Sequence, residues 1–100
     1  MTIDEQLTNL LDRERALRDA TTDPGAKGRL DDQIEGLDEQ LESLIDGTWD
    51  TTTDAYKAAS NSISKAAEAA GAAQANLAKL DGALAAADQA ISALAVLIGA

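Results

Sequence analysis

The sequence contains no cysteine, histidine or phenylalanine, and only one proline, one tryptophan and one tyrosine. Without cysteine and histidine it forms no disulfide and offers no thiol nucleophile, no imidazole base and none of the usual zinc ligands. A helical di-iron site needs histidine as well as carboxylates. Four carboxylates in the first half of the chain follow a helical spacing, but without histidine they do not complete such a site: Asp31, Glu35, Asp38 and Glu42. We therefore expect no enzyme activity, no catalytic or metal-binding residues and no cofactor.

Basic residues are scarce, because 8 Lys and Arg stand against 18 Asp and Glu, for a net charge of −10. Residues 1–50 carry a net charge of −9 and residues 51–100 a net charge of −1. Contact with phosphate groups requires clustered Lys and Arg, so direct binding to nucleic acid or to an anionic membrane is not expected. An acidic, polar N-terminus and the lack of a long uncharged apolar run predict neither a secretory signal nor a transmembrane span. A cytoplasmic, a virion-associated and a signal-independent exported location all stay open.

The first 46 residues carry the pattern of an antiparallel helical hairpin. Thr2 and Glu5 form a capping-box motif, Asp23-Pro24-Gly25 reads as a turn, and Gly47 suits a helix C-terminus. Apolar residues at alternating steps of three and four follow both arms. Folding the arms together pairs residues whose numbers add up to 51, which places the bend at the Asp23-Pro24-Gly25 turn. The predicted hairpin core is Leu7, Leu10, Leu17, Ile34, Leu37, Leu41 and Leu44.

Glu14 is the one polar residue on the first apolar seam, where it faces Leu37. We expect it to reach Arg18 or water, and a role in setting the helix register is a further hypothesis. Arg18 is also placed to meet Asp31 across the hairpin.

After a turn at residues 47–50, one heptad register continues to the C-terminus. Thr51 and Asp54 supply an N-cap pattern, and residues 51–100 are predicted to form an alanine-rich helix. The last turns, AISALAVLIGA, are apolar on nearly every face, which favours burial in an oligomer or against a partner, or the inner position in a compact bundle. The predicted interaction seam is Trp49, Tyr56, Ile63, Leu77, Leu80, Leu84, Ile91, Leu94 and Ile98.

Two all-α architectures fit this pattern. In the first, residues 51–98 form one continuous coiled-coil helix of about 72 Å, which projects beyond the hairpin and pairs with other chains. In the second, the helix bends near Gly71 and the chain closes into a monomeric four-helix bundle. We favour the continuous helix, because no proline or cap residue marks a break at Gly71 and glycine costs only about 1 kcal/mol inside a helix.

The stretch LIDGTWDTTTDAYKAA resembles the Trp-x-Gly helical-hairpin family of type VII secretion substrates, which are about a hundred residues long. The layout of Leu44, Trp49, Ala55 and Tyr56 carries the resemblance, although Thr51 stands where that motif has its glycine. The resemblance implies that Trp49 packs in a turn against a partner or a second copy.

Three functions follow as expectations. The first is a non-catalytic structural or assembly protein, for example a component of a virion or a secretion apparatus, which forms homo-oligomers or binds partner helices. The second is a small acidic inhibitor or adaptor that binds a basic surface of another protein, as phage-encoded inhibitors do. The third is a type VII secreted hairpin.

Overall fold

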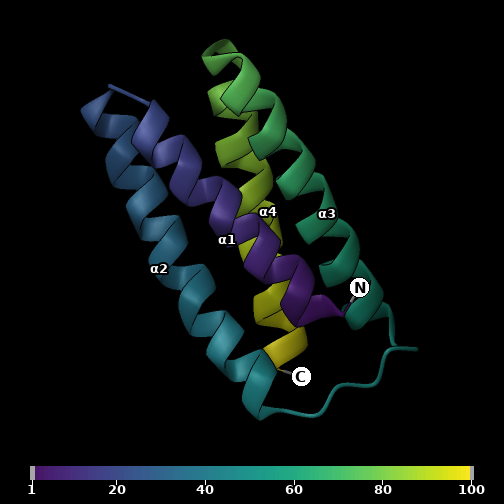
Figure 1. The fold of residues 1–100 in the computed structure, drawn as a ribbon. Helices are drawn as coiled ribbons and strands as arrows, with labels where there is room; N and C mark the ends of the chain where they lie inside the picture. Colours follow the sequence, from purple (N-terminus) through teal and green to yellow (C-terminus); the bar gives the residue numbers. More distant parts are fainter. Residues whose placement is uncertain (1, 100) are drawn as a thin grey trace.

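The computed structural model describes residues 2–99, which form four α-helices and one short 3₁₀ turn (Figure 1). No strand occurs among these residues, so the predicted all-α class is confirmed. The elements are α1 (Ile3–Ala20), α2 (Pro24–Asp46), α3 (Asp54–Ala75), η1 (Leu77–Lys79) and α4 (Leu80–Gly99).

The first two helices form the predicted antiparallel hairpin. The Thr2–Glu5 capping box is present, Asp23 caps α2, and Pro24 is the first residue of α2. Arg18 reaches Asp31 across the hairpin at 3.1 Å, as predicted. A second ion pair joins Arg15 to Asp38 at 3.0 Å, so the contacts follow the predicted register.

The third helix begins two residues later than the Thr51 pattern predicts. Thr53 is its N-cap and accepts a hydrogen bond from the backbone N–H of Tyr56. Asp50 instead organises the preceding turn, because its carboxylate accepts from both the backbone N–H and the hydroxyl of Thr52. Of the three consecutive threonines at positions 51–53, Thr53 therefore serves as the N-cap.

The continuous helix over residues 51–98 is not formed, and the four-helix bundle is the architecture that the chain adopts. The break lies at Asn76 rather than near Gly71. Asn76 ends α3 with an extended backbone, and its side-chain oxygen accepts from the N–H of Ala78 at the start of η1. Asparagine caps helix starts well, and folding back lets α3 and α4 bury their apolar faces against each other.

Gly71 lies inside α3 and has a packing role instead of a hinge role. A side chain there would meet the Nη1 atom of Arg13, whose guanidinium also donates to the carbonyl of Ala67. The glycine therefore leaves room for a side chain that joins α1 to α3.

The four helices form two antiparallel hairpins, α1–α2 and α3–α4. The hairpins lie side by side, so that α1 runs parallel to α3 and α2 runs parallel to α4. Hydrogen bonds between α1 and α3 join residues 54 to 58 positions apart, and those between α2 and α4 join residues 51 to 59 positions apart. A nearly constant separation identifies parallel neighbours. Both hairpin turns therefore lie at one end of the bundle, and the termini and the connection over residues 47–53 lie at the other (Figure 1).

The core consists of two apolar clusters, one toward each end. The larger lies toward the termini and includes Leu7, Leu10 and Ile63, and the smaller lies toward the hairpin turns and includes Leu17 and Leu84. Six of the seven predicted hairpin-core residues are buried, and Leu41 is only partly buried. The apolar pattern thus located the hairpin core correctly except at this one position.

Trp49 packs in the connection between α2 and α3. Its indole Nε1 donates to the carbonyl of Leu44 at 2.9 Å, which satisfies a backbone group at the end of α2. Gly47 is the C-cap, as predicted, but its backbone is extended, with φ of −99°. Its lack of a side chain makes room for the tryptophan, because a Cβ atom there would lie 2.5 Å from Trp49 Cζ2.

Candidate protein-interaction surface

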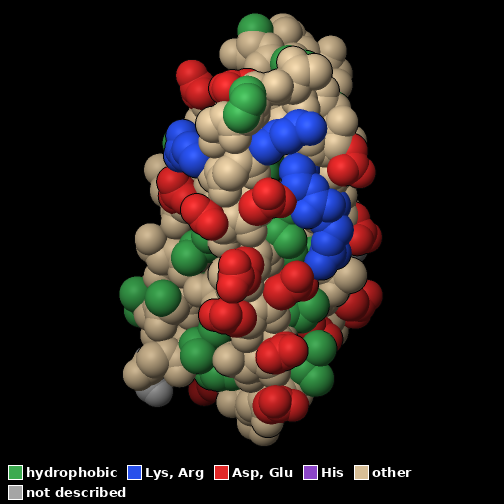
Figure 2. All heavy atoms as spheres, turned by 90° about the vertical axis from the view of Figure 1, so that its left-hand side faces the viewer, with side chains coloured by type: hydrophobic (Ala, Val, Ile, Leu, Met, Phe, Trp, Pro, Cys, Tyr) green, Lys and Arg blue, Asp and Glu red, His purple; other side chains and the backbone are tan. Residues whose placement is uncertain are grey.

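The surface charge is segregated along the α1–α2 hairpin. Residues 2–12 and 35–50, which the antiparallel fold brings together, contain nine acidic and no basic residues. Residues 13–34, nearer the turn, contain five acidic and five basic residues. The net charge of −9 carried by residues 1–50 therefore comes entirely from the end of the hairpin near the termini. We call this end, residues 2–12 and 35–50, the acidic half (Figure 2).

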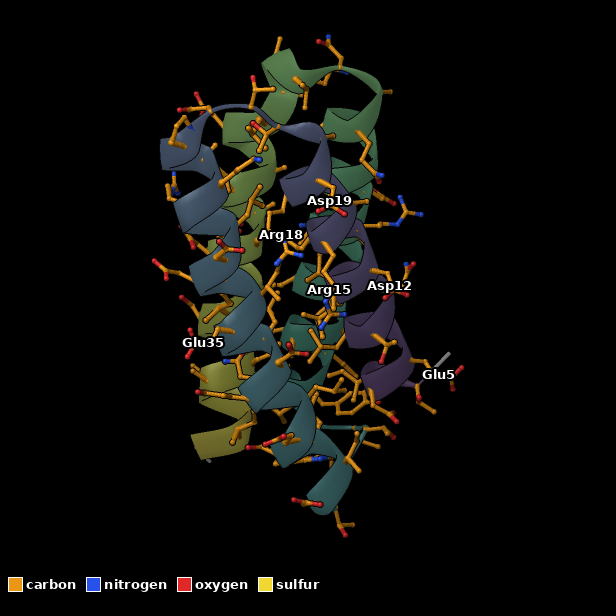
Figure 3. All side chains as sticks on the ribbon, turned by 60° about the vertical axis from the view of Figure 1, so that its left-hand side comes forward. Glu5, Asp12, Arg15, Arg18, Asp19 and Glu35 are labelled. Atoms are coloured by element: carbon orange, nitrogen blue, oxygen red, sulfur yellow. The ribbon has the colours of Figure 1, made fainter. Side chains whose placement is uncertain are left out.

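Arginines mark the boundary of the acidic half. Arg15 and Arg18 lie in the space between α1 and α2, where they bind Asp38 and Asp31, while Glu35 points to the outer side of α2 (Figure 3). Arg15 also approaches Asp12 at 3.8 Å. These side chains are about half exposed, so we expect the pairs to fix register more than they add stability.

A shallow groove lies between the two helices in the acidic half. Its apolar part is formed by Leu41, which was predicted to be core, and by Ile45, which is 64% exposed. The remaining lining is polar or acidic and comes from α1: Asp4, Glu5, Thr8, Asn9 and Asp12. We call this feature the acidic groove.

Local hydrogen bonds lower the pKa of two carboxylates of the acidic half. The side chain of Thr2 lowers the pKa of Asp4, and the side chain and backbone of Thr52 lower the pKa of Asp50. An exposed aspartate is negative at neutral pH without any shift, and the lowered pKa extends the charge of these two groups to more acidic pH.

A polar layer separates the two core clusters. Glu14 in α1 is fully buried, and neither of its carboxylate oxygens has a hydrogen-bond partner. Burial, followed by the negative charge of Asp88, raises the pKa of Glu14 to about 7. Gln33 in α2 is also buried, and it donates to the carbonyl of Leu84 and to Asp88. The expectation that Glu14 reaches Arg18 or water is therefore wrong.

The predicted interaction seam lies largely inside the chain. Ile63, Leu84 and Leu94 are at most 1% exposed. A second group is partly buried and consists of Trp49, Tyr56, Leu80, Ile91 and Ile98. Leu77, at the α3–α4 turn, is 44% exposed. In this structure the seam therefore holds α3 and α4 to each other and to the first hairpin.

The outer side of α4 is uncharged beyond Asp88, and its exposed residues there are Gln89, Ser92, Ala95, Val96 and Gly99. Val96 is 63% exposed, while Leu94 and Leu97 are buried. By length and composition alone, Leu77–Gly99 is apolar enough to cross a membrane, with a mean hydropathy of 1.6. One such helix is weak evidence, because the core helix of a soluble bundle has the same properties. The last turns of α4 thus combine core positions with one exposed large apolar residue, Val96.

Several features of this surface had only weak sequence signals. Ile45 lies off the apolar seam between Glu42 and Asp46, and a large apolar residue in such a place is a recognisable sign of exposure. Leu11 is also off the seam, yet it is buried, on the side of α1 that carries Arg15 and Arg18 and faces α2. The packing of α1 against α2 thus buries Leu11 and leaves Ile45 exposed, although both lie off the seam.

The residues that carry the type VII resemblance lie around the α2–α3 connection. Trp49 bonds to Leu44, and Ala55 and Tyr56 pack against the larger core cluster. Comparison of the chain with protein-family models, curated proteins and solved structures finds no match. The resemblance therefore stays a prediction.

Proposed function

We propose that this chain is a non-catalytic protein-binding module that recognises a basic surface of a partner protein through its acidic half. The observation that carries the proposal is the charge segregation, which places nine acidic and no basic residues on one half of a helical hairpin. This is the second of the three functions expected from the sequence, and the proposal assigns the acidic half as its binding face.

Charge complementarity supports this reading on physical grounds. Clustered surface charge of one sign accelerates association with an oppositely charged partner and selects against like-charged ones. In residues 13–34, Arg18 pairs with Asp31 of the same stretch, and Arg15, at the boundary, pairs with Asp38 of the acidic half. The carboxylates of the acidic half have few cations of this chain nearby, so they are available to a partner.

The test is affinity capture from the source cell with matched charge variants. One triple variant neutralises the acidic half (Glu39→Gln, Glu42→Gln, Asp46→Asn), and its control neutralises three exposed carboxylates elsewhere (Asp32→Asn, Glu68→Gln, Asp81→Asn). We expect a captured protein to be lost with the first variant, retained with the control and eluted by salt, because salt screens exposed charges. Equal capture by both variants would contradict the proposal.

Self-association is a second candidate, favoured by the exposure of Val96 on an uncharged stretch of α4. Copies that meet through this side avoid repulsion between their acidic halves. Light scattering on a sizing column across a tenfold concentration range tests it, with Val96→Ser as the variant. A monomeric mass at every concentration excludes a homo-oligomer over that range.

A further inference from the structure

We propose that the acidic groove is the docking site for an amphipathic helix of the partner, with an apolar stripe flanked by lysine or arginine. This inference rests on the proposed function and adds the site and the chemistry of its occupant. It requires an apolar contact surface, a complementary charged rim and a shape that admits a helix.

Leu41 and Ile45 supply the apolar surface. They are four positions apart on α2 and therefore lie on the same side of the helix, one turn from each other. Ile45 is one of three large hydrophobic residues that are strongly exposed among residues 2–99, with Leu77 and Val96. Only Ile45 among the three lies in the acidic half, where apolar contact and charge can act together.

The rim of the groove selects a cationic occupant. Asp4, Glu5 and Asp12 line it from α1. Glu42 lies next to Leu41 in sequence and three positions before Ile45, so its carboxylate lies on the same side of α2. No Lys or Arg is among the lining residues, and Arg15 stands at the end nearer the hairpin turn, where it holds Asp12 and Asp38.

The same rim argues against other occupants. A second copy would bring its own acidic half against this one, and like charges across an interface oppose association. Nucleic acids and anionic membranes are repelled in the same way. A cationic protein segment remains the complementary choice.

The length of the groove matches two turns of a helix. Residues 4–12 of α1 span about 12 Å, or two helical turns, alongside Leu41 and Ile45. An amphipathic helix presents apolar anchors at positions i, i+3 or i+4, and i+7, which matches a groove of that length. Its flanking Lys or Arg side chains then lie over the carboxylates on both sides.

Three synthetic peptides of equal length test the proposal by fluorescence anisotropy with the whole chain. The first is helical, with leucines at i, i+4 and i+7 and lysines on the flanking positions. The second keeps every lysine but has serine in place of leucine, and the third keeps every leucine but has glutamate in place of lysine. We expect the first to bind most tightly, with affinity that falls as salt increases.

Matched variants of the chain locate the site. We expect Ile45→Ser to weaken binding of the first peptide about tenfold, whereas Val96→Ser, which changes an equally exposed residue outside the groove, leaves it unchanged. Asp12→Asn with Glu42→Gln should weaken binding more than Asp81→Asn with Glu68→Gln, which removes the same charge elsewhere. Circular dichroism confirms that each variant is folded.

The outcomes separate this inference from the proposed function. If the first two peptides bind equally and Ile45→Ser has no effect, the groove inference is wrong while recognition of a basic partner stands. If Val96→Ser weakens binding as much as Ile45→Ser, the docking site is elsewhere. If neither lysine peptide binds at low salt, both proposals fail.

Discussion

Glu14 in α1 and Asp88 in α4 are coupled across the bundle, because the negative charge of Asp88 adds to burial in raising the pKa of Glu14 to about 7. Asp88 is itself held by Gln33 and Arg29 from α2. Three helices therefore contribute to one polar layer, and the pKa of Glu14 depends on how they pack.

This coupling predicts a pH-dependent stability. The unfolded chain titrates Glu14 near 4.5 and the folded chain near 7, so the folded state binds more protons between these values. The free energy of unfolding should therefore fall by about 2 to 3 kcal/mol between pH 5 and pH 8, with the cost absent below 4.5 and complete above 7. Urea unfolding at a series of pH values measures the change.

Glu14→Gln should remove most of this pH dependence and stabilise the chain at pH 8. Glu35→Gln, an exposed substitution on α2, is the control and should leave the slope unchanged. Asp4 and Asp50 have lowered pKa values, so any contribution from them is lost only as the pH falls below about 4, outside the window. An identical slope in wild type and Glu14→Gln would contradict the assignment.

The contact of Trp49 with Gly47 predicts that this glycine does not tolerate a side chain. Gly47→Ala should lower the free energy of unfolding by about 1 to 3 kcal/mol, because the new methyl group overlaps the indole ring. Trp49→Phe should cost about 1 kcal/mol or more through loss of the hydrogen bond to Leu44. Thermal unfolding followed by circular dichroism measures both, and an unchanged midpoint for Gly47→Ala would rule out the predicted overlap.

Gly71 and Gly36 make a matched pair of helical glycines. A Cβ atom at Gly36 meets nothing within 4 Å, so Gly36→Ala should stabilise the chain by up to about 1 kcal/mol through helix propensity. Gly71→Ala should gain less, because the Arg13 guanidinium must move. In an Arg13→Ala background the two substitutions should gain equally, and a persisting difference would show that Arg13 is not the cause.

The cap at Asn76 leads us to predict that losing it promotes dimer formation. Asn76→Ala removes the acceptor for the Ala78 N–H and should cost about 1 kcal/mol, whereas Asn76→Asp should retain most of the stability. Where the cap is lost, α3 and α4 can join into one long helix that exchanges hairpins with a second copy. Light scattering detects this exchange as a dimer, and a wild-type mass at all concentrations would exclude it.

The first hairpin was predictable because two independent signals agree. The Asp23-Pro24 turn and the apolar spacing both place the bend at the same point, and Arg18 meets Asp31 as that register requires. The acidic groove was not predictable in the same way, because the apolar seam places Leu41 in the core, whereas in the packed hairpin Leu41 is only partly buried and lines the groove with Ile45.

The second hairpin was harder to predict from the sequence. A heptad pattern looks the same for one continuous helix and for two helices that fold back with the same residues facing inward. Ala70 and Leu84 stay inward on both sides of the break, and Leu77 alone shows it by its exposure at the turn. The only local signal was Asn76, whose capping ability is small compared with the apolar area that folding back buries. Tertiary packing thus decided what the local sequence left open.

The parallel docking of the hairpins also has a kinetic consequence. Each hairpin closes through a short turn, whereas the contacts between hairpins join residues more than 50 positions apart, so local closure should precede docking during folding. Asp88 belongs to the second hairpin, and docking is the step that brings its charge toward Glu14. Raising the pH through 7 should therefore accelerate separation of the hairpins while helix formation within each stays unaffected.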